Sequence, residues 1–301
     1  MSDSRLSLLF DNGQFTAIEP YLQSGEETAA LDAGFGAVGG IKVYAFSQYG
    51  ALDKAQCEKL LKVYDLAVKT GCPIIGIYNS DGVKLTEGFA VLSAYGEVLK
   101  AISRVSGVVL QLAVIDGSCL GISSVMANMA DIVMATKGSD FYLTPGSDAT
   151  LDDVASGGVA DVICESLDDA FDTVIKLLTL LPANNLSPLP QLEYDAPQSN
   201  MLGNMEGIAD ADSAIELKAN YSDTVKTGLA SVGGITSGII QFSGAPLNVR
   251  SVYQAEWLVK FCDAFNIPVI TVADADGCSK ENEPQLMTAL TKLVSAYASA
   301  T

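Results

Sequence analysis

The sequence contains no histidine in 301 residues. This absence excludes Ser-His-Asp and Cys-His catalysis, and it excludes a zinc site that uses imidazole ligands. Basic residues are also scarce, because 17 Lys and Arg stand against 36 Asp and Glu, for a formal net charge of −19. Without a basic patch, nucleic acid and anionic membrane surfaces are poor candidate partners, and we expect neither. Any chemistry must come from carboxylates, lysine, tyrosine, serine or backbone groups.

Paired cysteine motifs and long apolar runs are absent as well. The cysteines are scattered without metal-ligand spacing, which predicts buried free thiols in a reducing compartment and no metal site. They are Cys57, Cys72, Cys119, Cys164, Cys262 and Cys278. We expect no signal peptide, and no apolar run is long enough to cross a bilayer. We therefore expect a cytoplasmic protein without membrane insertion.

The sequence does contain an internal duplication. GCPIIGIYNSDG at 71–82 returns as NIPVITVADADG at 266–277, each a Pro, a β-branched run and a polar end in Asp-Gly. A Gly pair with a strand-like run and an amphipathic helical pattern precede each copy, and a second helical pattern follows. These flanking segments are 39–47, 53–71 and 89–103 in the first copy, and 233–243, 249–266 and 284–299 in the second. The alternation predicts a duplicated α/β fold.

The two copies are expected to differ in extent. The first continues through 107–135 as a buried strand, a Gly-containing turn, a short helix and another strand, whereas the second reaches Thr301 where that strand would begin. The Pro, Asn and Ser content of 180–201 is typical of a linker. We therefore predict a first domain over 1–190 and a partial second domain over 191–301.

The turn IDGSCLGISS follows a predicted strand and opens a helix. Unpaired N–H groups at such a place can hold a developing oxyanion, and Gly lets the backbone approach a ligand. From the local pattern alone, an ordinary tight turn between a strand and a helix is the favoured interpretation. It is not a dinucleotide fingerprint, because it lacks the G-x-G-x-x-G spacing.

The chain resembles the carboxyltransferase subunits of biotin-dependent acyl-CoA carboxylases and decarboxylases. Segments along nearly the whole chain fall in family order, and FCDAFNIP within the last of them is especially diagnostic. They are VYAFSQ (43–48), VYDLAVKTGCPIIGIYNSDG (63–82), EGFAVLSAYGEVL (87–99), GVVLQLAVIDGSC (107–119), MADIVM (129–134), LLPANN (180–185) and VKFCDAFNIPVITVADADG (259–277). The resemblance implies a duplicated crotonase-like (ClpP/crotonase) spiral α/β fold whose second copy is incomplete.

The same resemblance implies a mechanism and a set of residues. In the family, two backbone N–H groups of a G-P-C-A-G-G turn hold the thioester oxygen of an acyl-CoA, and the second half holds carboxybiotin from a separate carrier protein. The family turn corresponds to residues 117–122 and a further ligand loop to 79–88. The implied catalytic residues are Gly121 and Ile122, and the implied substrate-binding residues are Gly117, Ser118, Cys119, Leu120, Asp81, Gly82 and Lys84.

Several of these positions depart from the family pattern. Ile122 replaces a Gly, and we expect it to resist positive φ and to add bulk beside the thioester. Asp81 replaces a Gly and Lys84 replaces an Arg, while the second, biotin-binding hole is expected to be missing. The favoured hypothesis is an acyl-CoA carboxyltransferase subunit. The alternatives are a catalytically inactive paralogue that serves as a structural or regulatory partner, and a decarboxylase or thioesterase that uses the first hole alone.

Partners follow from the same resemblance. We expect a homo-oligomer, because an incomplete second half leaves an edge or apolar face that needs a partner. A biotin carrier protein and a chain that completes the second half are further expected partners.

Overall fold

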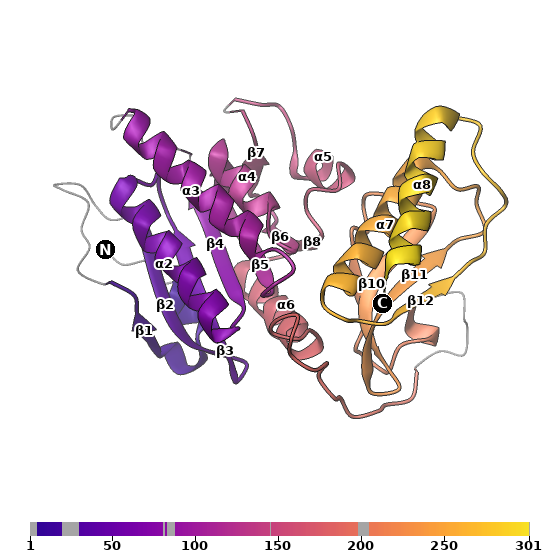
Figure 1. Cartoon of the computed structure of the whole chain (residues 1–301), viewed down its shortest axis with the longest axis horizontal. Helices are drawn as coiled ribbons and strands as arrows, with labels where there is room; N and C mark the ends of the chain where they lie inside the picture. The colour runs from indigo at the N-terminus through magenta and orange to yellow at the C-terminus, as the bar shows by residue number, and fades with distance from the viewer. Residues whose placement is uncertain are drawn as a thin grey trace. The chain divides into compact units, whose positions relative to one another are not determined.

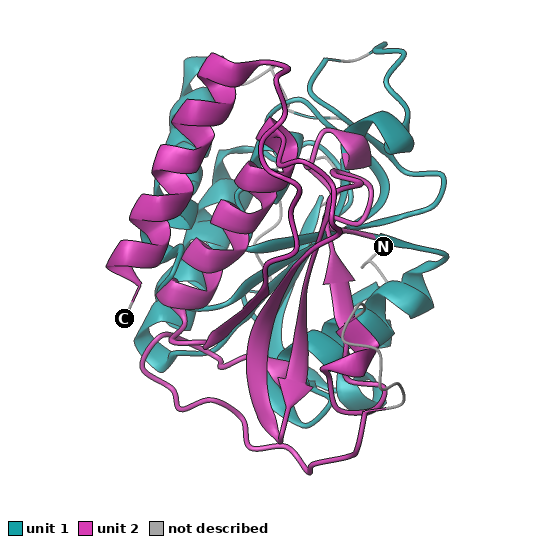
Figure 2. Cartoon of the chain, turned by 90° about the vertical axis from the view of Figure 1, so that its right-hand side faces the viewer, with its two compact units in different colours: residues 1–154, 163–179 teal, residues 155–162, 180–301 magenta. Residues whose placement is uncertain are grey.

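The computed structural model describes residues 5–19, 30–80, 82, 88–144, 146–197 and 205–300. The chain divides into two compact units, the first comprising 1–154 and 163–179 and the second comprising 155–162 and 180–301 (Figure 2). No helix in the described ranges has both the length and the apolar character that crossing a membrane requires. The domain boundary between 190 and 191 stays a prediction.

Unit 1 is built on a mixed sheet of eight strands in the order β1-β2-β3-β4-β5-β6-β8, with β7 paired to β5. β2 and β3 form an antiparallel hairpin, and β3, β4, β5 and β6 then run parallel. The strands are β1 (Phe15–Ala17), β2 (Leu31–Val38), β3 (Ile41–Gln48), β4 (Ile74–Ser80), β5 (Gln111–Leu120), β6 (Ile132–Thr136), β7 (Asp140–Tyr142) and β8 (Val162–Cys164).

Two long helices lie side by side against this sheet, α2 (Lys54–Thr70) and α3 (Phe89–Val105) (Figure 1). Asp53 begins α2 through a reciprocal capping box with Gln56, and Gly71 ends it in the left-handed conformation. The other helical segments are α1 (Arg5–Leu9), η1 (Asp11–Gly13), α4 (Ile122–Asn128), α5 (Leu151–Ser156) and α6 (Leu167–Leu180). The predicted strand, turn, short helix and strand over 107–135 are therefore present as β5, α4 and β6.

Unit 2 contains a four-stranded sheet in the order β12-β11-β10-β9. Its strands are β9 (Ile215–Leu217), β10 (Val225–Val232), β11 (Ile235–Phe242) and β12 (Val269–Val272). Its helical segments are η3 (Met205–Gly207), α7 (Val249–Ala264) and α8 (Glu283–Ser299), and the last two lie side by side (Figure 1). The predicted linker attaches to this unit, because the Leu192 N–H donates to the Gly234 carbonyl at 3.0 Å.

The predicted duplication is confirmed by strand order. β10, β11 and β12 repeat β2, β3 and β4, with the hairpin antiparallel and the last pair parallel in both units. The carbonyl of Pro73 accepts from the Tyr44 N–H at 2.9 Å, and the carbonyl of Pro268 accepts from the Gly238 N–H at 2.9 Å. The repeated Pro therefore marks the same point of the same parallel pair.

A second feature is repeated in the two units, although the sequence patterns did not predict it: a carboxylate binds the turn of each hairpin. Asp11 accepts hydrogen bonds from the N–H groups of Gly39 and Gly40, which form the turn of the first hairpin. Asp210 accepts from Gly233 at 2.9 Å and Gly234 at 2.8 Å, which form the turn of the second. A carboxylate thus holds each Gly-Gly turn, whose residues all have positive φ.

The two carboxylates differ in burial. Asp210 is 3% exposed and also accepts from the Ser231 hydroxyl at 2.5 Å. Burial alone would raise the pKa of the Asp210 carboxyl, but the hydrogen bonds from Ser231 and the two Gly N–H groups lower it overall.

We predict that Asp210→Ala lowers the free energy of unfolding by about 3 kcal/mol, because three donors lose their charged acceptor and two of them, the Ser231 hydroxyl and the Gly234 N–H, are buried. The matched change Asp11→Ala, at a half-exposed carboxylate, should cost less than about 1 kcal/mol. Urea unfolding of both variants measures the difference. Because the pKa of Asp210 is lowered on folding, its contribution is present at neutral pH and is lost as the pH falls through that lowered value. Equal losses in the two variants would contradict the prediction.

Candidate active site

The candidate site lies where the parallel strands of unit 1 end. In parallel α/β sheets, ligands bind beyond the carboxyl ends of the strands. β4 ends at Ser80 and β5 ends at Leu120, and a Cβ placed on Gly121 would lie 4.0 Å from the Cα of Gly82. The structure therefore brings two of the candidate site residues, Gly82 and Gly121, close together. Asp81 and Lys84 lie outside the described residues.

In the structure, Gly121 is the single residue between the end of β5 and the start of α4. This residue caps α4 with φ +61° and ψ −130°, a conformation that an L-residue avoids. Ile122 is the first residue of α4 and has no positive φ, so the expectation that it resists the required conformation is wrong. Within the described part of the chain, neither the Gly121 N–H nor the Ile122 N–H donates a hydrogen bond. The turn thus offers two consecutive backbone donors.

The residues before Gly121 form a bulged strand instead of the longer turn we expected. Tyr78 pairs with Ile115 and Ser80 pairs with Cys119, so only Asn79 of β4 stands opposite the three residues 116–118 of β5. Such a bulge bends its strand and redirects the residues that follow.

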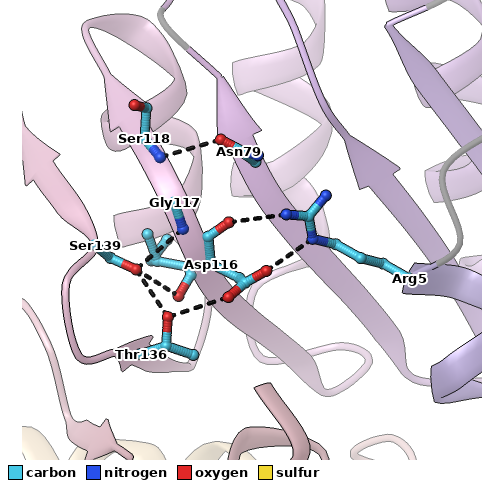
Figure 3. Close-up of polar contacts among 8 residues, drawn as sticks. Arg5, Asn79, Asp116, Gly117, Ser118, Thr136 and Ser139 are labelled. Atoms are coloured by element: carbon cyan, nitrogen blue, oxygen red, sulfur yellow. Dashed lines mark hydrogen bonds and ion pairs between the residues drawn. The ribbon is translucent and has the colours of Figure 1, made fainter. Parts of the chain in front are cut away.

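Polar groups hold this bulge from both sides (Figure 3). The Ser118 N–H donates to Asn79 Oδ1 at 3.1 Å, and the Gly117 N–H donates to Ser139 Oγ at 3.1 Å. Gly117 has φ +114°, and a Cβ there would lie 2.5 Å from Asn79 Oδ1. Its lack of a side chain therefore permits the close approach of Asn79, and the N–H groups of Gly117 and Ser118 are already used.

Asp116 in the bulge forms an ion pair that the sequence did not indicate. Arg5 Nε lies 2.8 Å from Asp116 Oδ2, and Thr136 Oγ1 donates to Asp116 Oδ1 at 3.2 Å (Figure 3). Thr136 also lies 2.9 Å from Ser139 Oγ. Residues from α1, β6 and the loop after β6 thereby fix the strand that leads into the Gly121 turn.

Cys119 and Leu120 lie at the end of β5, paired with Phe141 and Tyr142 of β7. The Cys119 side chain is fully buried, and this burial raises the pKa of its thiol well above the ordinary value. Its side chain is therefore packed in the core, and only its backbone shapes the turn.

Known proteins match both the fold and the sequence. Transcarboxylase 12S, solved as a hexamer assembly with methylmalonyl-coenzyme A and methylmalonic acid bound, has a TM-score of 0.89 at 25% identity, over 99% of this chain and 69% of that one. The predicted crotonase-like α/β fold is thus confirmed. A family profile described as a carboxyl transferase domain matches residues 1–150 and 153–301, and the chain belongs to this family.

Two relatives illustrate the sequence match. The propionyl-CoA carboxylase beta chain of Saccharopolyspora erythraea is 30% identical, over 91% of this chain and 61% of that protein. The methylmalonyl-CoA decarboxylase subunit alpha of Propionigenium modestum is 29% identical, over 91% of this chain and 63% of that protein. The chain therefore spans about three fifths of the length of these curated relatives.

The burial of Cys119 makes a simple prediction. In the native protein at pH 8, iodoacetamide should modify the exposed Cys278 while Cys119 stays unmodified, because a buried protonated thiol is a poor nucleophile. Peptide mass spectrometry after timed alkylation measures both positions, with urea-unfolded protein as the control in which both react. Rapid native alkylation of Cys119 would contradict the burial of its side chain.

Proposed function

We propose that the chain acts on an acyl-CoA as a carboxyltransferase-type subunit of a biotin-dependent carboxylase or decarboxylase. The N–H groups of Gly121 and Ile122 would stabilise the thioester enolate. The observation that carries this proposal is the open turn at the end of β5, where two consecutive N–H groups have no partner within the described part of the chain. Such donors stabilise charge that develops in the transition state, and they need no histidine.

The path of the electron pair during decarboxylation explains what the two N–H groups would do. When a carboxylated acyl thioester loses carbon dioxide, the bond between the α-carbon and the carboxylate breaks and its electron pair stays on the α-carbon. That pair delocalises onto the thioester oxygen, and the two N–H groups then donate to an oxygen that carries more charge than in the ground state. This difference between transition state and ground state is what lowers the barrier.

The other predicted residues would act on the shape of the site. Gly117 and Ser118 set the bulge, while the backbone of Cys119 and Leu120 leads into Gly121. Gly82 lies against Gly121 without a side chain to obstruct a ligand. Asp81 and Lys84, which stand near Gly82 in the sequence, are proposed to contact the CoA portion.

The family resemblance puts a biotin-binding hole in the second half of the chain. Over its described residues, unit 2 contains β9 to β12, α7 and α8, and it has no counterpart of β5, the Gly121 turn and α4. The described residues of unit 2 therefore do not supply a second oxyanion hole. Biotin on a separate carrier protein would need a hole formed by other residues or by another polypeptide.

The names of the relatives support a proposal on the substrate class and the assembly. Two are named for propionyl-CoA and methylmalonyl-CoA, and the transcarboxylase structure is described as a hexamer. We therefore propose a short-chain acyl-CoA substrate and a homo-oligomer with biotin carrier protein as a partner. A catalytically inactive paralogue is not supported by these relatives, and a cytoplasmic location stays a prediction.

The decisive variant is Ile122→Pro, because Pro at the first position of a helix removes the N–H while preserving helical φ. Gly121, which has no Cβ, tolerates a following Pro. We expect I122P to lower kcat for methylmalonyl-CoA decarboxylation by about 100-fold or more, the effect of removing one oxyanion donor.

The control is Ile122→Ala, which shortens the side chain and keeps the N–H. I122A should keep the wild-type kcat within about threefold, and circular dichroism should show that both variants remain folded. Calorimetry with propionyl-CoA and methylmalonyl-CoA establishes binding by the unmodified chain. Equal activity in I122P and I122A would remove the Ile122 N–H from the mechanism.

A further inference from the structure

Behind the Gly121 turn lies a buried polar cluster that the sequence did not single out. We define it as Gln48, Ser80, Tyr95 and Ser123, from the ends of β3 and β4, from α3 and from the first turn of α4. The exposed fractions are 0%, 2%, 0% and 0%, in that order. Burying this many polar groups costs free energy unless they are paired, so the cluster needs an explanation.

Gln48 contacts both serines of the cluster. Its Nε2 donates to Ser80 Oγ at 2.8 Å, to Ser123 Oγ at 3.0 Å and to the Gly50 carbonyl at 3.0 Å. Its Oε1 is buried without a hydrogen-bond partner in the described structure. One amide group thus joins the ends of two parallel strands to the start of α4.

The cluster holds Gly82 at both of its backbone groups. The Gly82 N–H donates to Ser80 Oγ at 3.3 Å, and the Gly82 carbonyl accepts from the Tyr95 hydroxyl at 3.3 Å. Gly82 in turn lies against Gly121. The cluster therefore fixes both sides of the candidate site, Gly82 through Ser80 and Tyr95, and α4 through Ser123.

The matched positions of unit 2 hold apolar residues in place of two of these groups. Counting from the matched Tyr44 and Gly238, the position of Gln48 in unit 2 is Phe242. Counting from Pro73 and Pro268, the position of Ser80 is Ala275. Phe242 is the last residue of β11, and Ala275 lies beyond β12, which ends at Val272. Over the described residues, this polar cluster therefore occurs in the unit that carries the Gly121 turn.

We propose that Gln48 is a positioning residue, which acts through Ser80 and Ser123 to hold Gly82 and the Gly121–Ile122 donors in their working arrangement. This proposal rests on the proposed function for its catalytic consequence. Its structural consequence, a rigid turn, is independent of the substrate.

The test variant is Gln48→Met, which keeps the volume and removes the amide. The chain offers a matched control in unit 2, Gln254, which is 1% exposed. Gln254 Nε2 donates to Thr227 Oγ1 at 2.8 Å and to the Lys218 carbonyl at 3.2 Å, and its Oε1 also has no partner within the described residues. Q48M and Q254M should lose comparable thermal stability.

Only Q48M should loosen the site. We expect amide hydrogen exchange over 119–126 to rise about tenfold or more in Q48M and to stay unchanged in Q254M. We also expect kcat for methylmalonyl-CoA decarboxylation to fall about tenfold in Q48M with KM within about threefold, because misplaced donors weaken the transition state selectively.

The outcomes separate the two proposals. If wild-type protein neither binds nor decarboxylates methylmalonyl-CoA, the proposed function fails, while the exchange data still test the positioning role. Equal exchange over 119–126 in Q48M and Q254M overturns the positioning role, and so does faster exchange with unchanged kcat in an active protein. Should Q48M not fold, Ser123→Ala, which removes one of the three acceptors, is judged by the same two measurements.

Discussion

The parallel pairing of β3, β4 and β5 is the constraint on which the candidate site depends. Tyr44 pairs with Ile74, and Ile74 pairs with Gln111, so the three strands run in one direction and end at one edge of the sheet. Gln48, Ser80 and Leu120 are the last residues of these strands. Parallel strands require long connections, and the connection through α2 returns the chain to the same starting edge. Groups that are distant in sequence therefore meet without any local motif.

A comparison of the two units distinguishes features that both share from features that lie beside the candidate site in unit 1. Both units have a Gly-Gly hairpin turn held by a carboxylate, a capping box on the helix after the hairpin, and a Pro just before the next parallel strand. These features stabilise backbone turns and helix ends, so they recur wherever the fold recurs. The Gln48 cluster and the bulge at 116–118 occur in unit 1, and both lie beside the Gly121 turn.

The sequence predicted most of the helices, but it predicted fewer of the contacts at the candidate site. The helices at 53–71, 89–103, 249–266 and 284–299 were predicted to within a few residues, because the apolar period and Gly punctuation are strong local signals. The bulge at Gly117 could not be predicted, since it depends on Asn79 and Ser139 from other parts of the sheet. Gln48 at the end of an apolar strand gives no signal of its own, because its partners come from 32 and 75 residues away.

The departures from the family pattern do not remove the proposed donors, because these donors are backbone N–H groups. An N–H group is supplied by any residue except Pro, so Leu120 and Ile122 can replace smaller family residues without removing a donor. The positive φ falls on Gly121, which is retained, while Ile122 has a helical conformation. The polar contacts that orient the turn come from Gln48, Ser80 and Asn79, which lie outside the turn motif. A site of this kind is therefore tested better by the geometry of its donors than by the identity of its side chains, and the absence of histidine is compatible with catalysis.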